Sequence, residues 1–237
     1  MKKYLALLLA LVMCLSLLSA CGDTTGDNSQ APGSDAPASQ SIDPAKEGST
    51  AVTIGYVGGH YACYPSSANS DDFVQQGMVY DKLFEVDDNT GEYTSRVLSS
   101  WEWTDDKTLV MTLKDGITFS DGKQMTMEDV LFSLQNYITQ GETTDKYQYF
   151  QYIDFDASTI SEDGMTLTLV YQFPYGPAER TLNCSIMQKE FTEAHDNADQ
   201  IWYTGPVGSG PYEITDCVQD SYVTFTLRDD YWNSDYT

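Results

Sequence analysis

Basic residues are scarce in this chain, which has 12 Lys and Arg against 36 Asp and Glu and a formal net charge of −24 at pH 7. An acidic surface of this strength repels nucleic acids and anionic lipid headgroups, which argues against both as partners. It attracts cationic and zwitterionic ligands more readily than anionic ones. Since a well-solvated exterior also explains the charge, the charge alone does not identify a ligand.

Histidine and cysteine are also few. The two histidines, His60 and His195, stand in no HExxH motif, and the five cysteines form no CxxC motif and no Cys/His cluster. We therefore predict no structural zinc site, no other metal and no cofactor. After removal of an N-terminal leader and lipidation of a further cysteine, Cys63, Cys184 and Cys217 allow at most one disulfide, with three possible pairings.

The sequence also lacks the frames of known catalytic motifs. Ser209 lies between two glycines, but Val207 and Pro211 stand where a nucleophile elbow has its outer glycines. No Gly-rich phosphate loop with a lysine is present. Neighbouring carboxylates do not indicate a glycosidase pair in so acidic a chain. We predict no catalytic residue and a protein that is not an enzyme; a surface hydrolase is the alternative.

The one long apolar run lies at the N-terminus. Two lysines precede residues 5–18, a run that is too short to cross a bilayer comfortably and is followed by small residues. This pattern predicts a signal peptide over residues 1–20. Leu18-Ser19-Ala20-Cys21 is typical of a lipobox, so we expect a lipid on Cys21 and an anchor in the outer face of the cytoplasmic membrane. An ordinary signal peptide that contains a cysteine is the alternative.

A polar segment separates this leader from the rest of the chain. Residues 22–50 contain no aromatic residue and only one large aliphatic residue, Ile42. Such a composition cannot bury enough apolar surface to offset the entropy of ordering. We predict that residues 21–50 are a lipidated cysteine and a flexible linker, and that a globular body begins near residue 51.

A strand, two turns and a capped helix are predicted in the middle of the body. Residues 109–113 alternate between apolar and polar side chains, as in a half-buried strand. Asp-Gly pairs at 115–116 and 121–122 predict turns. Thr126 and Asp129 have the spacing of a capping box, and apolar residues then recur at helical spacing as far as residue 138.

The remaining body is predicted from similar patterns. Residues 87–92 begin like a calcium loop, but the twelfth position is Leu98 instead of a bidentate Glu, which favours a hairpin turn. The tyrosine-rich segment 147–152 indicates core packing, with a sugar or peptide site as the alternative. Further strands are expected at 51–57, 166–170 and 223–227, with another after the turn that contains Gly208 and Gly210, and helices are expected at 69–84 and 187–198.

Several segments, taken in order, resemble the extracellular solute-binding proteins of family 5, the peptide and nickel type of the ABC importers. They are Val79-Tyr80-Asp81-Lys82-Leu83-Phe84-Glu85, Val97-Leu98-Ser99-Ser100-Trp101, Phe119-Ser120-Asp121-Gly122, Thr126-Met127-Glu128-Asp129-Val130, Pro206-Val207-Gly208-Ser209-Gly210-Pro211-Tyr212 and Tyr231-Trp232. One segment departs from the family, because Arg228-Asp229-Asp230 replaces the Asn-Pro that often precedes the Tyr-Trp pair. The departure leaves the geometry of that turn open.

The resemblance implies an α/β fold of the periplasmic-binding-protein-like type II class, cluster C, with a mixed-sheet lobe and an additional small α+β domain. Family members continue into a second lobe that is absent here, so we expect this chain to be the N-terminal part of a longer protein. The implied divisions are a signal peptide (1–20), a lipidated linker (21–50), a first segment of lobe I (51–75), the additional domain (76–179) and a second segment of lobe I (180–237).

The resemblance also implies a function. The full protein would be a monomeric substrate-binding lipoprotein that captures an oligopeptide or similar small solute and delivers it to an ABC permease in the membrane, on the periplasmic side where a second membrane exists. The alternatives are a binding protein for nickel chelates or oligosaccharides, or a non-transport surface lipoprotein that serves as a signalling receptor or structural module.

The family places the loop after its first strand at the mouth of the ligand cleft. Glycines allow a ligand to approach the backbone, and tyrosines offer an apolar face with one hydroxyl. The resemblance therefore implies ligand contacts at Gly58, Gly59, His60, Tyr61 and Tyr64. An ordinary turn with surface aromatic residues is the alternative.

Overall fold

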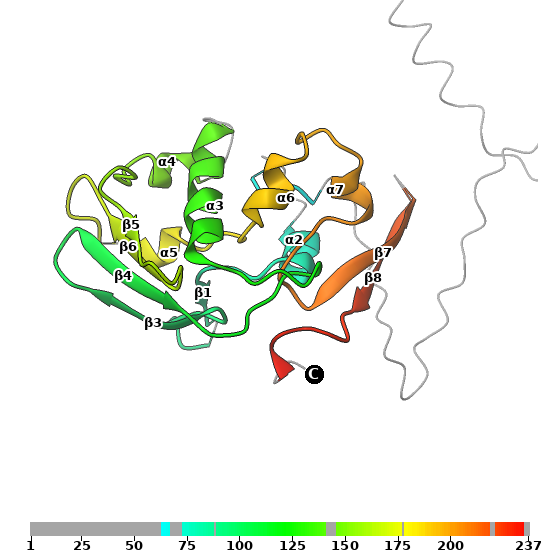
Figure 1. The fold of residues 1–237 in the computed structure, drawn as a ribbon, viewed down its shortest axis with the longest axis horizontal. Helices are drawn as coiled ribbons and strands as arrows, with labels where there is room; N and C mark the ends of the chain where they lie inside the picture. The colour runs from blue at the N-terminus through cyan, green and yellow to red at the C-terminus, as the bar shows by residue number, and fades with distance from the viewer. Residues whose placement is uncertain are drawn as a thin grey trace, which may run out of the picture. The chain divides into compact units, whose positions relative to one another are not determined.

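The computed structural model describes residues 63–66, 73–87, 89–140, 146–176, 178–218 and 221–234, which belong to one compact unit, Tyr56–Thr237. Figure 1 shows its elements. The helices are α2 (Phe73–Val79), α3 (Met127–Thr139), α4 (Tyr147–Phe150), α5 (Ala178–Thr181), α6 (Lys189–Glu193) and α7 (Ile201–Thr204). The strands are β1 (Glu85–Val86), β2 (Tyr93–Thr94), β3 (Leu98–Trp103), β4 (Thr108–Leu113), β5 (Thr159–Ile160), β6 (Thr166–Val170), β7 (Tyr212–Val218) and β8 (Tyr222–Leu227).

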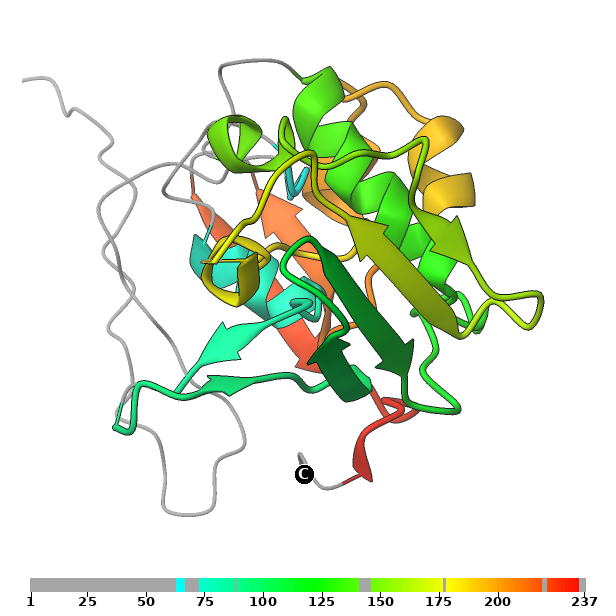
Figure 2. The same cartoon turned by 90° about the vertical axis from the view of Figure 1, so that its left-hand side faces the viewer.

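An antiparallel sheet with the strand order β3-β4-β6-β5 forms one end of the unit (Figures 1 and 2). In β4 the side chains of Leu109 and Met111 are buried, and they lie opposite Leu169 and Leu167 of β6. Alternate residues of a strand point to opposite faces, so one face of both strands joins the core. The strands predicted at 109–113 and 166–170 are therefore confirmed, whereas β3 lies in a segment that was noted in the sequence only for its family resemblance.

The connection from β4 to α3 follows the predicted turns and cap. Gly116 and Gly122 adopt φ angles of 78° and 83°, which only glycine takes up without steric cost. The Thr126 N–H donates to Asp129 Oδ2 at 2.9 Å, as part of a capping box. The apolar face of α3 is buried in the same core as the sheet, which confirms the predicted helix.

The helix predicted at 69–84 is wrong beyond Val79, where α2 ends. Beyond it the chain pairs with a distant segment. The carbonyl of Asp81 accepts the Ile186 N–H at 3.0 Å, and the Leu83 N–H donates to the Cys184 carbonyl at 3.0 Å. These long-range backbone bonds replace the helical ones. The predicted start of the helix lies outside the described residues.

The helix predicted at 187–198 is also shorter than expected. It begins at Lys189 and ends at Glu193, and α7 forms separately after it. The Lys189 N–H donates to Asp129 Oδ1 at 2.9 Å, so the first turn of α6 is fixed to the capping residue of α3. His195 follows α6, where its Nδ1 lies 2.8 Å from the Phe191 carbonyl.

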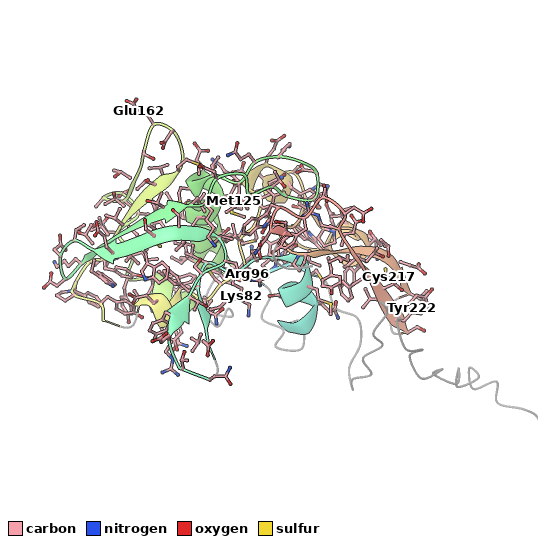
Figure 3. The ribbon with its side chains drawn as sticks, turned by 90° about the horizontal axis from the view of Figure 1, so that it is seen from below. Lys82, Arg96, Met125, Glu162, Cys217 and Tyr222 are labelled. Carbon is pink, nitrogen blue, oxygen red and sulfur yellow. The ribbon has the colours of Figure 1, made fainter. Side chains whose placement is uncertain are left out.

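The described residues contain two clusters of buried hydrophobic side chains. The larger extends from Leu83 to Met187 and includes the sheet and α3. The smaller consists of Cys63, Val79, Tyr80 and Ile214, with β7 and β8 side chains packed against it. The β7–β8 hairpin, which carries Cys217 and Tyr222 in Figure 3, confirms the two strands predicted there. The predicted domain boundaries remain a prediction.

The shorter predicted features can also be located. Asp87 Oδ1 accepts the backbone N–H groups of Asn89 and Thr90 at 2.8 and 2.9 Å, so the acidic segment is a hairpin turn between β1 and β2. In the tyrosine-rich segment 147–152, Phe150 is buried and its ring meets that of Tyr137 edge to face, with ring centroids 5.7 Å apart, so this residue packs in the core.

Within the described ranges, no helix has the length and apolar character to span a bilayer.

Candidate functional site

The residues predicted to contact a ligand are only partly described. Gly58, Gly59, His60 and Tyr61 lie outside the described residues, as does the predicted lipidation site Cys21. Tyr64 is described, so the geometry of the predicted loop begins with the segment 63–66.

Tyr64 is buried, with 5% of its surface exposed. Its ring meets Trp202 of α7 edge to face, with ring centroids 4.6 Å apart, a favourable geometry for two aromatic rings. Its hydroxyl donates to Asn136 Oδ1 of α3 at 3.1 Å. Tyr64 is therefore held between two helices.

The backbone of Cys63 is held on both sides. Its N–H donates to the Trp202 carbonyl at 2.7 Å, and its carbonyl accepts the hydroxyl of Tyr80 at 2.8 Å. Burial raises the pKa of Tyr80 well above its ordinary value, so this phenol remains a hydrogen-bond donor.

Cys63, Cys184 and Cys217 are thiols, and none of these three takes part in a disulfide.

A buried carboxylate joins three of the segments that carry the family resemblance. Asp81 accepts the indole N–H of Trp232 at 2.9 Å and the hydroxyl of Tyr231 at 3.1 Å. Arg96 lies 3.2 Å from the same carboxylate. The Asp81 backbone N–H donates to Ser209 Oγ at 3.2 Å. Burial raises the pKa of Asp81, since it outweighs the opposing effects of Arg96 and the hydrogen bonds.

A buried guanidinium makes a second connection. Arg228 is 4% exposed and donates to the carbonyls of Phe119 at 3.1 Å, Gly210 at 3.2 Å and Gly208 at 3.4 Å. The Ser120 N–H also donates to the Gly208 carbonyl, at 2.9 Å. The segment that departs from the family pattern thus supplies the side chain that ties two family segments together. We name this arrangement, with the Asp81 contacts, the motif junction.

The glycines of the motif junction are required for close packing on α2. A Cβ atom added at Gly208 would lie 2.0 Å from the Val79 carbonyl oxygen, and one at Gly210 would lie 2.5 Å from the Met78 carbonyl oxygen. The Gly210 N–H donates to that Val79 carbonyl at 2.8 Å. This backbone contact lies at the last residue of α2, and only glycine leaves room for it.

The polar groups of the motif junction are engaged in structural contacts. Ser209 is fully buried, and its Oγ accepts the Asp81 backbone N–H. In the part of the chain that the structure describes, no group of three or more His, Cys, Asp or Glu side chains could hold a metal ion.

A shallow depression of about 350 Å³ lies at the start of α3 and α6. Two ion pairs lie in it: Lys123 Nζ is 2.7 Å from Glu190, and Lys189 Nζ is 3.7 Å from Glu128. Asp129 and Glu193 also line the depression, so its acidic side chains outnumber its lysines.

The fold defines the class of protein. The structure of NikZ from Campylobacter jejuni in complex with Ni(L-His) aligns with a TM-score of 0.63 at 20% identity, over 72% of this chain and 34% of that one. The similarity confirms the predicted α/β, periplasmic-binding-protein-like type II fold. The chain belongs to the bacterial extracellular solute-binding proteins, family 5, whose "Middle" region matches residues 92–236.

Two relatives illustrate the range of the family. The nickel-binding protein NikA of Staphylococcus aureus is 30% identical over 152 residues, which are 64% of this chain and 28% of that protein. The dipeptide-binding protein of Escherichia coli is 26% identical over 177 residues, which are 66% of this chain and 33% of that protein. The chain thus spans about a third of the length of these relatives.

Proposed function

We propose that this chain is part of a substrate-binding lipoprotein of an ABC importer, and that the protein captures an oligopeptide and delivers it to a membrane permease. The family match over residues 92–236 carries the proposal. In this proposal Cys21 bears the lipid and the protein is a monomer outside the cytoplasmic membrane. It transforms no substrate.

The proposed ligand contacts come from the loop that contains Gly58, Gly59, His60, Tyr61 and Tyr64. Tyr64 is 5% exposed and its hydroxyl is bonded to Asn136, so contact of this residue with a ligand is confined to the small part of its surface that remains open. Backbone groups and a small number of aromatic faces suit a peptide whose side chains vary, because they bind what all peptides share. Enclosure between two closing lobes would complete the binding.

A nickel chelate is the second candidate. The relative with 30% identity is named a nickel-binding protein, and this observation favours the candidate over other small solutes. The described residues offer no cluster of metal ligands, so recognition of nickel would have to act through the chelating molecule or through residues outside the described ranges.

Uptake in cells tests the proposal. A strain that lacks the gene would be supplied with a labelled tripeptide or with labelled nickel and histidine, and complemented with the wild-type gene or the Cys21→Ser variant. We expect peptide uptake to depend on the wild-type gene and to be lower with the variant, because the unlipidated protein is lost from the membrane surface. Gene-dependent nickel uptake alone would favour the second candidate. Uptake of both probes that does not depend on the gene would refute import.

A further inference from the structure

One side-chain oxygen of α3 holds the segment 63–66. Asn136 Oδ1 accepts the hydroxyl of Ser66 at 2.6 Å and the hydroxyl of Tyr64 at 3.1 Å. An amide oxygen has two lone pairs, so both are used by this one segment. The two donors stand on either side of Pro65, and Asn136 lies 72 positions from Tyr64 in the sequence.

A second amide extends this connection. Gln140 Nε2, one turn further along, donates to the Tyr64 hydroxyl at 3.3 Å. Its Oε1 accepts the side-chain N–H of Asn197 at 3.1 Å. All of these groups are neutral, so salt and pH leave their bonds largely unchanged.

These hydrogen bonds join the two hydrophobic clusters. Cys63 belongs to the smaller cluster, whereas Leu134 and Tyr137 of α3 belong to the larger one. Apolar contact is not directional, but a hydrogen bond requires a defined distance and angle. The Asn136 bonds therefore set the position of the segment 63–66 relative to α3 more narrowly than packing alone.

We propose that Asn136 is a positioning residue for ligand binding, which acts by holding Tyr64 and Ser66 in the arrangement that the ligand requires. The inference rests on the proposed function, in which Tyr64 belongs to the ligand loop. A loop that is already ordered loses less conformational entropy when a ligand binds. Asn136 itself does not contact the ligand in this account.

Three variants of the full-length protein separate this role from a general effect on folding. Asn136→Leu removes the acceptor at similar volume, and Asn136→Asp keeps an oxygen that accepts both hydroxyls. Gln135→Leu is the matched control, because Gln135 is the neighbouring residue of α3 and is exposed.

Hydrogen exchange of the Cys63, Tyr64 and Ser66 amides shows, without a ligand, how firmly the Asn136 hydrogen bonds hold the segment 63–66. The Cys63 amide, which is bonded to the Trp202 carbonyl, is the most informative of them. We expect exchange about tenfold faster in Asn136→Leu, since two hydrogen bonds are lost, and near the wild-type rate in the other two variants. Equal exchange in Asn136→Leu and the wild type would overturn the inference.

Calorimetric titration with a mixture of tripeptides and with Ni(II)–histidine then measures the effect on binding. We expect an affinity about tenfold weaker for Asn136→Leu and a nearly unchanged affinity for Asn136→Asp and Gln135→Leu. Faster exchange with unchanged affinity in Asn136→Leu would show that Asn136 stabilises the segment 63–66 but does not affect ligand binding. This result would overturn the positioning role. If the wild-type protein binds neither probe, the proposed function is refuted, and the positioning role with it. The exchange rates still show in that case whether the Asn136 hydrogen bonds hold the segment 63–66.

Discussion

The indole N–H of Trp232 donates to the carboxylate of Asp81 at 2.9 Å, across a sequence separation of 151 positions. Tyr231 adds a second hydrogen bond and Arg96 an ion pair to the same buried carboxylate. Segments that are far apart in the sequence are therefore joined by one side chain. Removal of the Asp81 side chain should therefore lower the stability of the whole unit and not only of one strand.

Replacement of Asp81 tests this junction. Asp81→Ala removes the acceptor of two buried donors and one partner of Arg96, and a broken buried pair leaves its remaining members poorly compensated. We expect the free energy of unfolding to fall by about 3 kcal/mol in urea titrations. Asp229→Ala, at an exposed carboxylate, is the control and should change it by less than about 0.5 kcal/mol. Equal losses in the two variants would show that the junction contributes nothing.

The raised pKa of Asp81 predicts a dependence of stability on pH. Because the folded state binds this proton more tightly than the unfolded state, the contribution of Asp81 is fully present below the unfolded pKa, near 3.8, and is lost as the pH rises through the folded pKa. The free energy of unfolding of the wild type relative to Asp81→Asn should therefore decrease as the pH rises above the unfolded pKa of Asp81. A difference that increases over this range would contradict the raised pKa.

The glycines beside α2 should not tolerate a methyl group. In Gly208→Ala the new Cβ would meet the backbone oxygen of Val79, which cannot move without disturbing the end of α2. We expect a loss of more than about 3 kcal/mol in the free energy of unfolding. Gly205→Ala is the matched control, since nothing lies within 4 Å of its Cβ position. Thermal unfolding that is equally affected in both variants would argue against the close packing.

The contribution of Arg228 to stability should depend on its guanidinium group and not only on its positive charge. Arg228→Lys keeps the charge but replaces a planar fork by one ammonium group, which cannot donate to three carbonyls in the same directions. We expect about 2 kcal/mol lower stability in urea titrations. Arg180→Lys, at an exposed position of α5, should be neutral. A neutral Arg228→Lys would mean that the three hydrogen bonds do not contribute.

Local patterns predicted much of the fold. The alternation at 109–113 and the capping box of Thr126 and Asp129 gave correct elements, because strand period and helix capping depend on residues close in sequence. The end of α2 could not be predicted in this way. Its apolar spacing continues to residue 84, but backbone bonds to Cys184 and Ile186 determine where the helix stops.

The site was less accessible to sequence reasoning. Tyr64 was identified from the family loop, but its partner Asn136 is a single polar residue on a helix and has no distinguishing local pattern. Arg228 stood in the sequence as part of a departure from the family, and its burial depends on carbonyls of two segments that are distant in the sequence, at Phe119 and at Gly208 and Gly210. Asp81 lies in a family segment, but nothing in that segment indicates a buried carboxylate.

The most direct test of the central claim is calorimetric titration of the purified full-length protein with defined solutes. Mixed tripeptides, Ni(II)–histidine and a mannose oligosaccharide would be titrated separately, and peptide integrity would be checked by mass spectrometry afterwards. The account predicts saturable heat with peptides and recovery of the peptides intact. Hydrolysed peptides, or no heat with any of the three solutes, would contradict a solute-binding function.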